Sequence, residues 1–179
     1  MIKPSIFLLF VSAFLAPACS QDGQTSNSAM TVQEHAERQQ VDLAVNEAIN
    51  EPGGGDYARA VEIIQRSDRP FDVKRYQIAQ LIVGSHAQPG SRRPPQTLQE
   101  GLAILEQTAV EGVPGIEGAA QGLRMTFERG VGSPPDGIPI DPVVADCWHK
   151  LENGGAGDPA KCVALRRERL PQLSVGSGG

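Results

Sequence analysis

Two stretches of this chain repeat each other at a spacing of about 40 residues, and this limits the possible folds more than any other feature. Ala79 and Ala119 lie 40 positions apart, as do Gly90 and Gly130. Four further pairs lie 43 positions apart, because the second copy has a longer loop: Leu102 and Ala145, Leu105 and Trp148, Gly112 and Gly155, and Ala119 and Cys162. A period of this length with two helices per copy predicts an α-solenoid, in which stacked units bury a continuous core.

Helix ends are marked by residues that cap free backbone groups. The predicted starts are Thr31 with Glu34, Asp56, Thr97 with Glu100, Asp141 before Pro142, and Asp158 before Pro159. Glycines mark the predicted ends, and no alternating strand pattern appears. These signals predict an all-α fold with helices over 32–49, 56–67, 72–87, 97–111, 115–129, 141–153 and 158–170.

The second copy resembles a Sel1-like repeat, a relative of the tetratricopeptide repeat. The matching residues are Ala119, Leu123, Phe127, Gly130, Gly132, Asp141, Ala145, Trp148 and Gly155. The chain departs from the family where Arg124 replaces a glycine and where extra residues separate Gly132 from Asp141. The first copy matches less fully, since it lacks the aspartate and the tryptophan. The resemblance implies a short solenoid of helix–turn–helix units with atypical capping helices.

The N-terminal segment has the features of a bacterial export signal. Lys3 precedes the apolar run IFLLFVSAFL, which is shorter than the about 20 residues that span a bilayer. Ala16 and Ala18 supply the small residues of a cleavage site. The segment resembles a lipoprotein signal, although Ala16 stands where leucine is favoured. We predict lipidation at Cys19, with Ser20 typical of outer-membrane sorting in that family. The alternative is a soluble secreted protein.

The predicted domain organisation follows from this signal and the repeat. A signal peptide covers 1–18, a flexible tether covers 19–30, the solenoid covers 31–171, and a disordered tail covers 172–179. The chain has 16 basic and 21 acidic residues. The first 18 residues hold one lysine and no acid, so the remainder carries a net charge of −6. Such a surface is not built to neutralise phosphates, so we expect no nucleic-acid partner.

Cys147 and Cys162 form a candidate disulfide in the oxidising bacterial envelope. Cys147 lies roughly 10 Å of helix before the intervening turn and Cys162 roughly 6 Å after it, so a bridge is feasible. The alternative is two buried free thiols. A zinc site is disfavoured because His149, two positions after Cys147, points to another side of the helix. We expect neither a metal nor another cofactor.

One polar stripe is the candidate surface for a partner protein. Glu117, Gln121, Arg124 and Glu128 recur at helical spacing opposite the apolar side of the predicted helix 115–129. In solenoids that resemble this one, the first helix of each unit lines the concave face where partners bind. Arg124 replaces a family glycine, so we expect its side chain not to be needed for packing. The alternative is an ordinary solvated face.

Three arginines close the last predicted helix. Arg166, Arg167 and Arg169 suggest a basic patch, but Glu168 interrupts them. We prefer the interpretation that these cations face the negative end of the helix dipole.

The sequence therefore predicts a protein-binding module and no enzyme. His35, His86 and His149 are scattered, and no motif of a hydrolase or phosphate-binding loop appears. We expect a non-catalytic module in the periplasm, anchored to the outer membrane and bound to another protein. By analogy with small, acidic, secreted Sel1-like proteins, that partner is expected to be a toxin that this protein neutralises. The alternatives are a structural adaptor in an envelope or secretion assembly and, more remotely, an envelope hydrolase.

Overall fold

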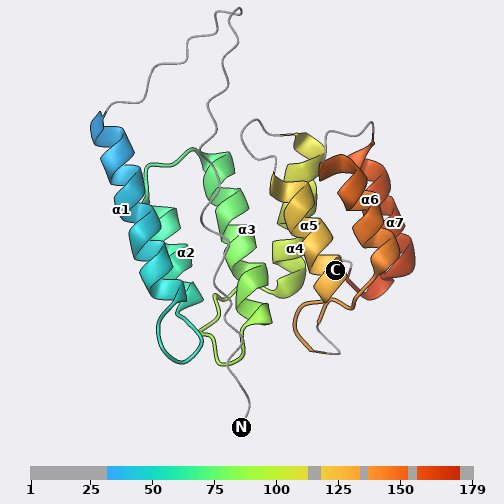
Figure 1. The fold of residues 1–179 in the computed structure, drawn as a ribbon, viewed down its shortest axis with the longest axis horizontal. Helices are drawn as coiled ribbons and strands as arrows, with labels where there is room; N and C mark the ends of the chain where they lie inside the picture. The colour runs from blue at the N-terminus through green and yellow to red at the C-terminus, as the bar shows by residue number, and fades with distance from the viewer. Residues whose placement is uncertain (1–31, 113–117, 134–136, 153–156, 174–179) are drawn as a thin grey trace, which may run out of the picture. The chain divides into compact units, whose positions relative to one another are not determined.

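The computed structural model describes residues 32–112, 118–133, 137–152 and 157–173. Within these ranges the chain is helical and contains no strand beyond two isolated bridges. The helices are α1 Val32–Ile49, α2 Tyr57–Arg66, α3 Phe71–Ala87, α4 Leu98–Glu111, α5 Gly118–Arg129, α6 Pro142–Glu152, α7 Pro159–Arg169 and the 3-10 helix η1 Pro171–Leu173 (Figure 1). The predicted all-α fold is confirmed.

Successive helices pack against one another along the chain, from α1 on α2 to α6 on α7. This is the order of a helical-repeat solenoid (Figure 1). One contact goes beyond the simple order, because α4 also packs against α7. The last four helices therefore form a closed ring of contacts, in which α7 returns to α4. This return brings together side chains that are about 60 positions apart in the sequence.

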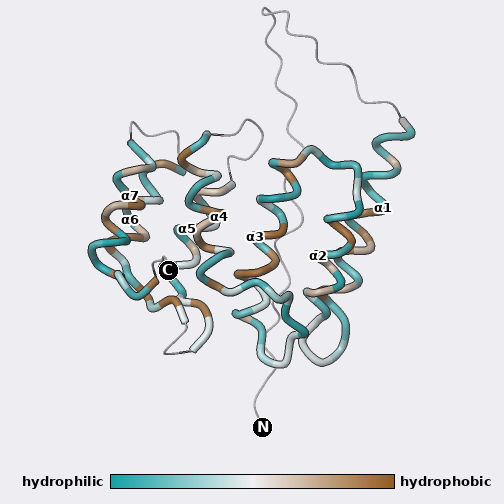
Figure 2. Tube along the Cα trace, turned by 180° about the vertical axis from the view of Figure 1, so that it is seen from behind, coloured by the Kyte–Doolittle hydropathy of each residue, from teal (hydrophilic) through white to brown (hydrophobic). Residues whose placement is uncertain are grey.

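The residues that define the repeat form the core. The equivalent positions Leu105 and Trp148 are both buried, and so are Ala79, Ala119 and Cys162 in the first helices of successive units. All of these except Ala119 belong to one cluster that runs from α3 to η1. Hydrophobic and hydrophilic stretches alternate along the helices (Figure 2), as expected for elements with one buried face. The repeat positions of both copies thus contribute to the core.

The two copies also share a backbone turn after their first helix. Gly90 and Gly130 have φ angles of +80° and +68°, a conformation that glycine adopts without steric cost. The longer loop of the second copy is closed by paired backbone hydrogen bonds between Val131 and Ile138, at 2.9 and 2.7 Å. Both of these side chains are buried. Val131 and Ile138 are therefore part of the core.

The predicted caps are present wherever the structure describes them. The Thr97 hydroxyl accepts a hydrogen bond from the Glu100 amide at 3.2 Å, and the Glu100 carboxylate accepts one from the Thr97 amide at 2.6 Å. Three aspartates cap α2, α6 and α7 in the same way: Asp56, Asp141 and Asp158. Satisfying these free amides stabilises each helix by about 1 kcal/mol. The predicted box at Thr31 lies outside the described residues.

The predicted boundary between domain and tail is wrong by two residues. The sequence placed the tail at 172–179, but Gln172 and Leu173 belong to η1. Leu173 is buried and joins the same core cluster as Leu170. Its burial extends the folded domain past Pro171. Residues 174–179 lie outside the described part of the chain.

Candidate protein-binding surface

The predicted partner stripe on α5 is only partly exposed. Gln121 and Arg124 are half-buried, and Glu128 is exposed. Glu117 lies outside the described residues. The structure thus places three of the four residues along α5 but does not make them a uniformly solvated face. Whether they contact a partner stays a prediction.

Arg124 serves the packing of this protein, and the expectation that it is not needed there is wrong. Its Nε donates to Glu152 Oε2 at 2.5 Å, and its Nη1 donates to Glu128 Oε2 at 2.7 Å. Glu152 lies at the end of α6, so the arginine ties α5 to α6. The hydrogen bond from Arg124 holds the pKa of Glu152 below its ordinary value. The long side chain therefore takes up space that a glycine would leave empty.

The predicted disulfide is present between Cys147 on α6 and Cys162 on α7, with 5.6 Å between their Cα atoms. Cys162 is buried and packs in the core. The bridge fastens α7 to the neighbouring helix. It therefore fixes the helix that makes the return contact with α4.

All three terminal arginines lie in the last turn of α7, as predicted, and two of them are also bound to acidic side chains within the protein. Arg166 donates to both oxygens of Glu106 on α4, at 2.7 and 2.5 Å. Arg169 Nε donates to Asp141 Oδ2 at 2.8 Å. Burial raises the pKa of Asp141, but hydrogen bonds from Arg169 and backbone amides outweigh it, so the pKa is lowered. Of these three arginines, only Arg167 has no ion pair with another described residue, and it is exposed.

A groove of about 990 Å³ runs between α4 and α7. Each wall of the groove is formed by side chains along one face of a helix. These are Ala103, Gln107 and Val110 on α4 and Ala160, Ala164 and Arg167 on α7. Because alanine side chains end at Cβ, the walls of the groove are shallow and apolar. Val110 adds an apolar side chain that is 46% exposed. Partly exposed apolar side chains beside a few polar groups are typical of binding surfaces. This groove is the candidate protein-binding surface.

The Glu106–Arg166 pair lies in the lining of this groove. Both side chains are only 4% exposed. Arg166 uses Nε and Nη2 for the glutamate, while its Nη1 is buried and has no hydrogen-bond partner. Buried donors are almost always paired in folded proteins, so this nitrogen is an exception, which it shares with Arg69 Nε, Arg75 Nε and Trp148 Nε1 among the described residues.

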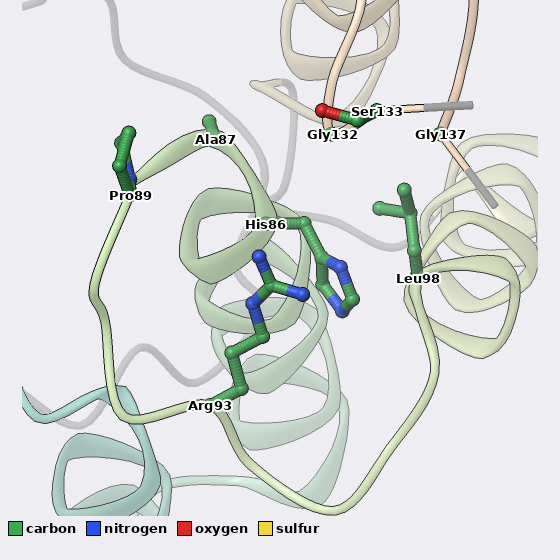
Figure 3. Close-up of a pocket in the computed structure, with 8 residues that line it drawn as sticks. All are labelled: His86, Ala87, Pro89, Arg93, Leu98, Gly132, Ser133 and Gly137. Carbon is green, nitrogen blue, oxygen red and sulfur yellow. The ribbon is translucent and has the colours of Figure 1, made fainter. Parts of the chain in front are cut away.

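A second cavity, of about 500 Å³, lies between the loop after α3 and the loop after α5. The guanidinium of Arg93 lies beside the imidazole of His86, with Ser133 across the cavity (Figure 3). The rim passes through Ser133 and Gly137, on either side of residues 134–136, which lie outside the described chain.

Some predicted features fall outside the described residues, Cys19 among them. Within the described ranges, no group of three or more His, Cys, Asp or Glu side chains is placed to hold a metal ion. No helix in those ranges is both long and apolar enough to span a membrane.

Sequence reasoning missed the buried pair beneath the groove, although a signal for it was present. Glu106 follows Leu102 by four positions and Arg166 follows Cys162 by four, and both leading residues are repeat positions. Residues four apart lie on the same side of a helix. An acid and a base on two apolar stripes were therefore candidates for burial as a pair.

Comparisons with known proteins identify no relative of this chain. A scan against protein-family models finds no match, and searches of curated proteins and of solved structures find none either. The resemblance of the second copy to a Sel1-like repeat therefore stays a prediction.

Proposed function

We propose that this protein is a non-catalytic protein-binding module of the bacterial cell envelope. The groove between α4 and α7 is the observation that carries the proposal. It combines an open, largely apolar lining with the exposed side chain of Arg167, which has no ion pair with another described residue. A partner that fills the groove would bury Val110 and the exposed Ala160 and Ala164, which favours binding.

The envelope location is supported by two independent features of the chain. The export signal before Cys19 predicts secretion. The disulfide between Cys147 and Cys162 is the kind of bond that persists in an oxidising compartment. Lipidation at Cys19 would hold the folded domain at a membrane surface through the following tether. We expect Cys19→Ser to leave the protein soluble or unprocessed. An unchanged mass and unchanged membrane association would instead indicate ordinary signal cleavage.

The role we propose for this binding is neutralisation of a toxin that acts in the envelope. Support comes from the resemblance to acidic Sel1-like proteins and from the net charge of −6 after residue 18, which would speed encounter with a basic partner. A deletion strain should become sensitive to sibling cells that secrete the toxin. A deletion strain that resists them as well as wild type would favour the adaptor role.

Co-purification tests the binding function directly. The tagged protein is expressed with its own signal and isolated from envelope extracts in mild detergent. We expect a stoichiometric partner to be retained by wild type and by Ala36→Arg, a control on the exposed face of α1. Ala164→Arg makes the same change in the groove and should release the partner. Absence of any stoichiometric partner from wild-type preparations would overturn the proposed function.

A further inference from the structure

We propose that the α4–α7 groove receives one amphipathic helix of the partner, which presents large apolar side chains to the alanines and an acidic residue to Arg167. This inference rests on the proposed function, because it describes the segment that the partner offers to the same groove. Each part of the description follows from a different side chain of the lining.

The walls of the groove favour a helix over an extended segment. On α4, Ala103, Gln107 and Val110 follow one another at spacings of four and three, and α7 repeats this pattern with Ala160, Ala164 and Arg167. A groove walled by two helical stripes can receive the ridge of a third helix. An extended peptide that binds by strand addition would instead need a free strand edge, and the described residues form no strand ladder. The occupant is therefore a helix laid along the groove.

The small walls determine the size of the partner's side chains. Ala103, Ala160 and Ala164 end at Cβ, so the volume of about 990 Å³ is left for groups from the other side. Leucine, methionine or phenylalanine at positions i, i+3, i+4 and i+7 of the partner would fill it. Val110, at one end of the groove, offers its exposed side chain to the last of them.

The charges at the two edges determine the orientation. Arg167, on the α7 edge, is exposed and forms no ion pair within the described residues. On the α4 edge, Glu111 already accepts hydrogen bonds from Arg75 and Gln107. One edge therefore attracts an acid, while the charge on the other is already balanced. A partner helix with acidic residues along one border of its apolar face fits this surface in a single orientation.

Site-specific photo-cross-linking identifies the segment that occupies the groove. A photoreactive phenylalanine replaces Ala164 in the full-length protein in cells, and a control replaces Ala36. Mass spectrometry then maps the cross-linked peptide. We expect one segment of another protein, cross-linked only from the groove position, with apolar residues at helical spacing and an acidic border. A cross-link to a second copy of this chain, to lipid, or to a segment without that pattern would overturn the inference.

A synthetic peptide of the mapped segment then tests each contact against the purified protein. Calorimetry should show binding, and circular dichroism should show that the peptide gains helix. Ala164→Arg should weaken binding about tenfold or more, whereas Ala36→Arg should not change it. Arg167→Glu should also weaken it, and a lysine in place of the peptide's acid should restore it. Equal binding to all four proteins would exclude the groove.

The two proposals fail in different ways. If wild type retains a partner but its cross-links come only from elsewhere, such as α5, the groove inference falls and the binding function stands. If no partner is retained by wild type at all, the binding function falls, and the groove inference falls with it.

Discussion

Breaking the buried pair between Glu106 and Arg166 should destabilise the protein far more than replacing both residues. The test is a double-mutant cycle with Glu106→Leu, Arg166→Met and the two together. Each single variant leaves one charge in a site where the wild-type side chains are 4% exposed. The double variant leaves no charge there and keeps apolar side chains of similar length between α4 and α7.

The structure indicates the size of the effect. Each single variant loses two charge-assisted hydrogen bonds, of 2.7 and 2.5 Å, and uncovers a buried charge, which typically costs about 3–5 kcal/mol. The lower end, about 3 kcal/mol, applies here because both residues line the groove and the surviving charge can turn toward water. The double variant should lie within about 1 kcal/mol of wild type, as isosteric replacement of buried pairs often does.

Urea unfolding followed by circular dichroism measures these differences as shifts in the midpoint at constant slope. The matched control is the same cycle on Asp146 and Lys150, whose side chains are 59% and 70% exposed. That pair should couple by less than about 1 kcal/mol. If the Glu106–Arg166 single variants cost no more than the exposed pair, or if their costs simply add in the double variant, this account of the pair is wrong.

Three further predictions follow from individual contacts. Replacing both cysteines of the α6–α7 disulfide by alanine should lower the unfolding free energy by about 3 kcal/mol, which is the chain-entropy value for a sequence separation of 15. Midpoints of urea unfolding, measured for the variant and for wild type with and without reductant, check this value. Gly101→Ala should destabilise the protein by about 1–3 kcal/mol, because the new Cβ would lie 2.7 Å from Ile82 Cγ2. Gly122→Ala should instead stabilise it by about 0.5–1 kcal/mol, because no atom lies within 4 Å of the new Cβ. Melting temperatures that shift in the same direction for both variants would contradict this prediction. Glu152→Gln should lower the unfolding free energy at neutral pH and make it fall less steeply as the pH is lowered. The reason is that Arg124 lowers the pKa of Glu152, so the stabilisation by the ionised carboxylate is lost as the pH falls through that lowered pKa. A variant whose unfolding free energy falls as steeply in acid as that of wild type would rule this out.

The fold was predictable because its signals are local or periodic. Thr97 and Glu100 lie three residues apart, so a capping box can be read directly from the sequence. Leu105 and Trp148 occupy equivalent places in two copies, so the repeat predicts that both are buried, and both are. Such features need no knowledge of the tertiary arrangement. The disulfide was predictable for a similar reason, since its cysteines lie on helices joined by a short turn.

The candidate surface was not predictable in the same way, because it depends on which distant side chains meet. Arg124 is paired with Glu152, 28 residues away, and Arg166 with Glu106, 60 residues away. Arginine and glutamate are also the usual residues of solvated helix faces, so their types alone do not distinguish the two fates. The return of α7 onto α4, which creates the groove, has no counterpart in the repeat pattern.

Hydrogen–deuterium exchange of the protein with and without its co-purified partner tests most directly whether the α4–α7 groove is the binding surface. The account predicts slower exchange in α4 and α7 on binding, with α1 unchanged. Slower exchange confined to α5, around Gln121 and Glu128, would contradict it and would return the binding surface to the stripe that the sequence first indicated.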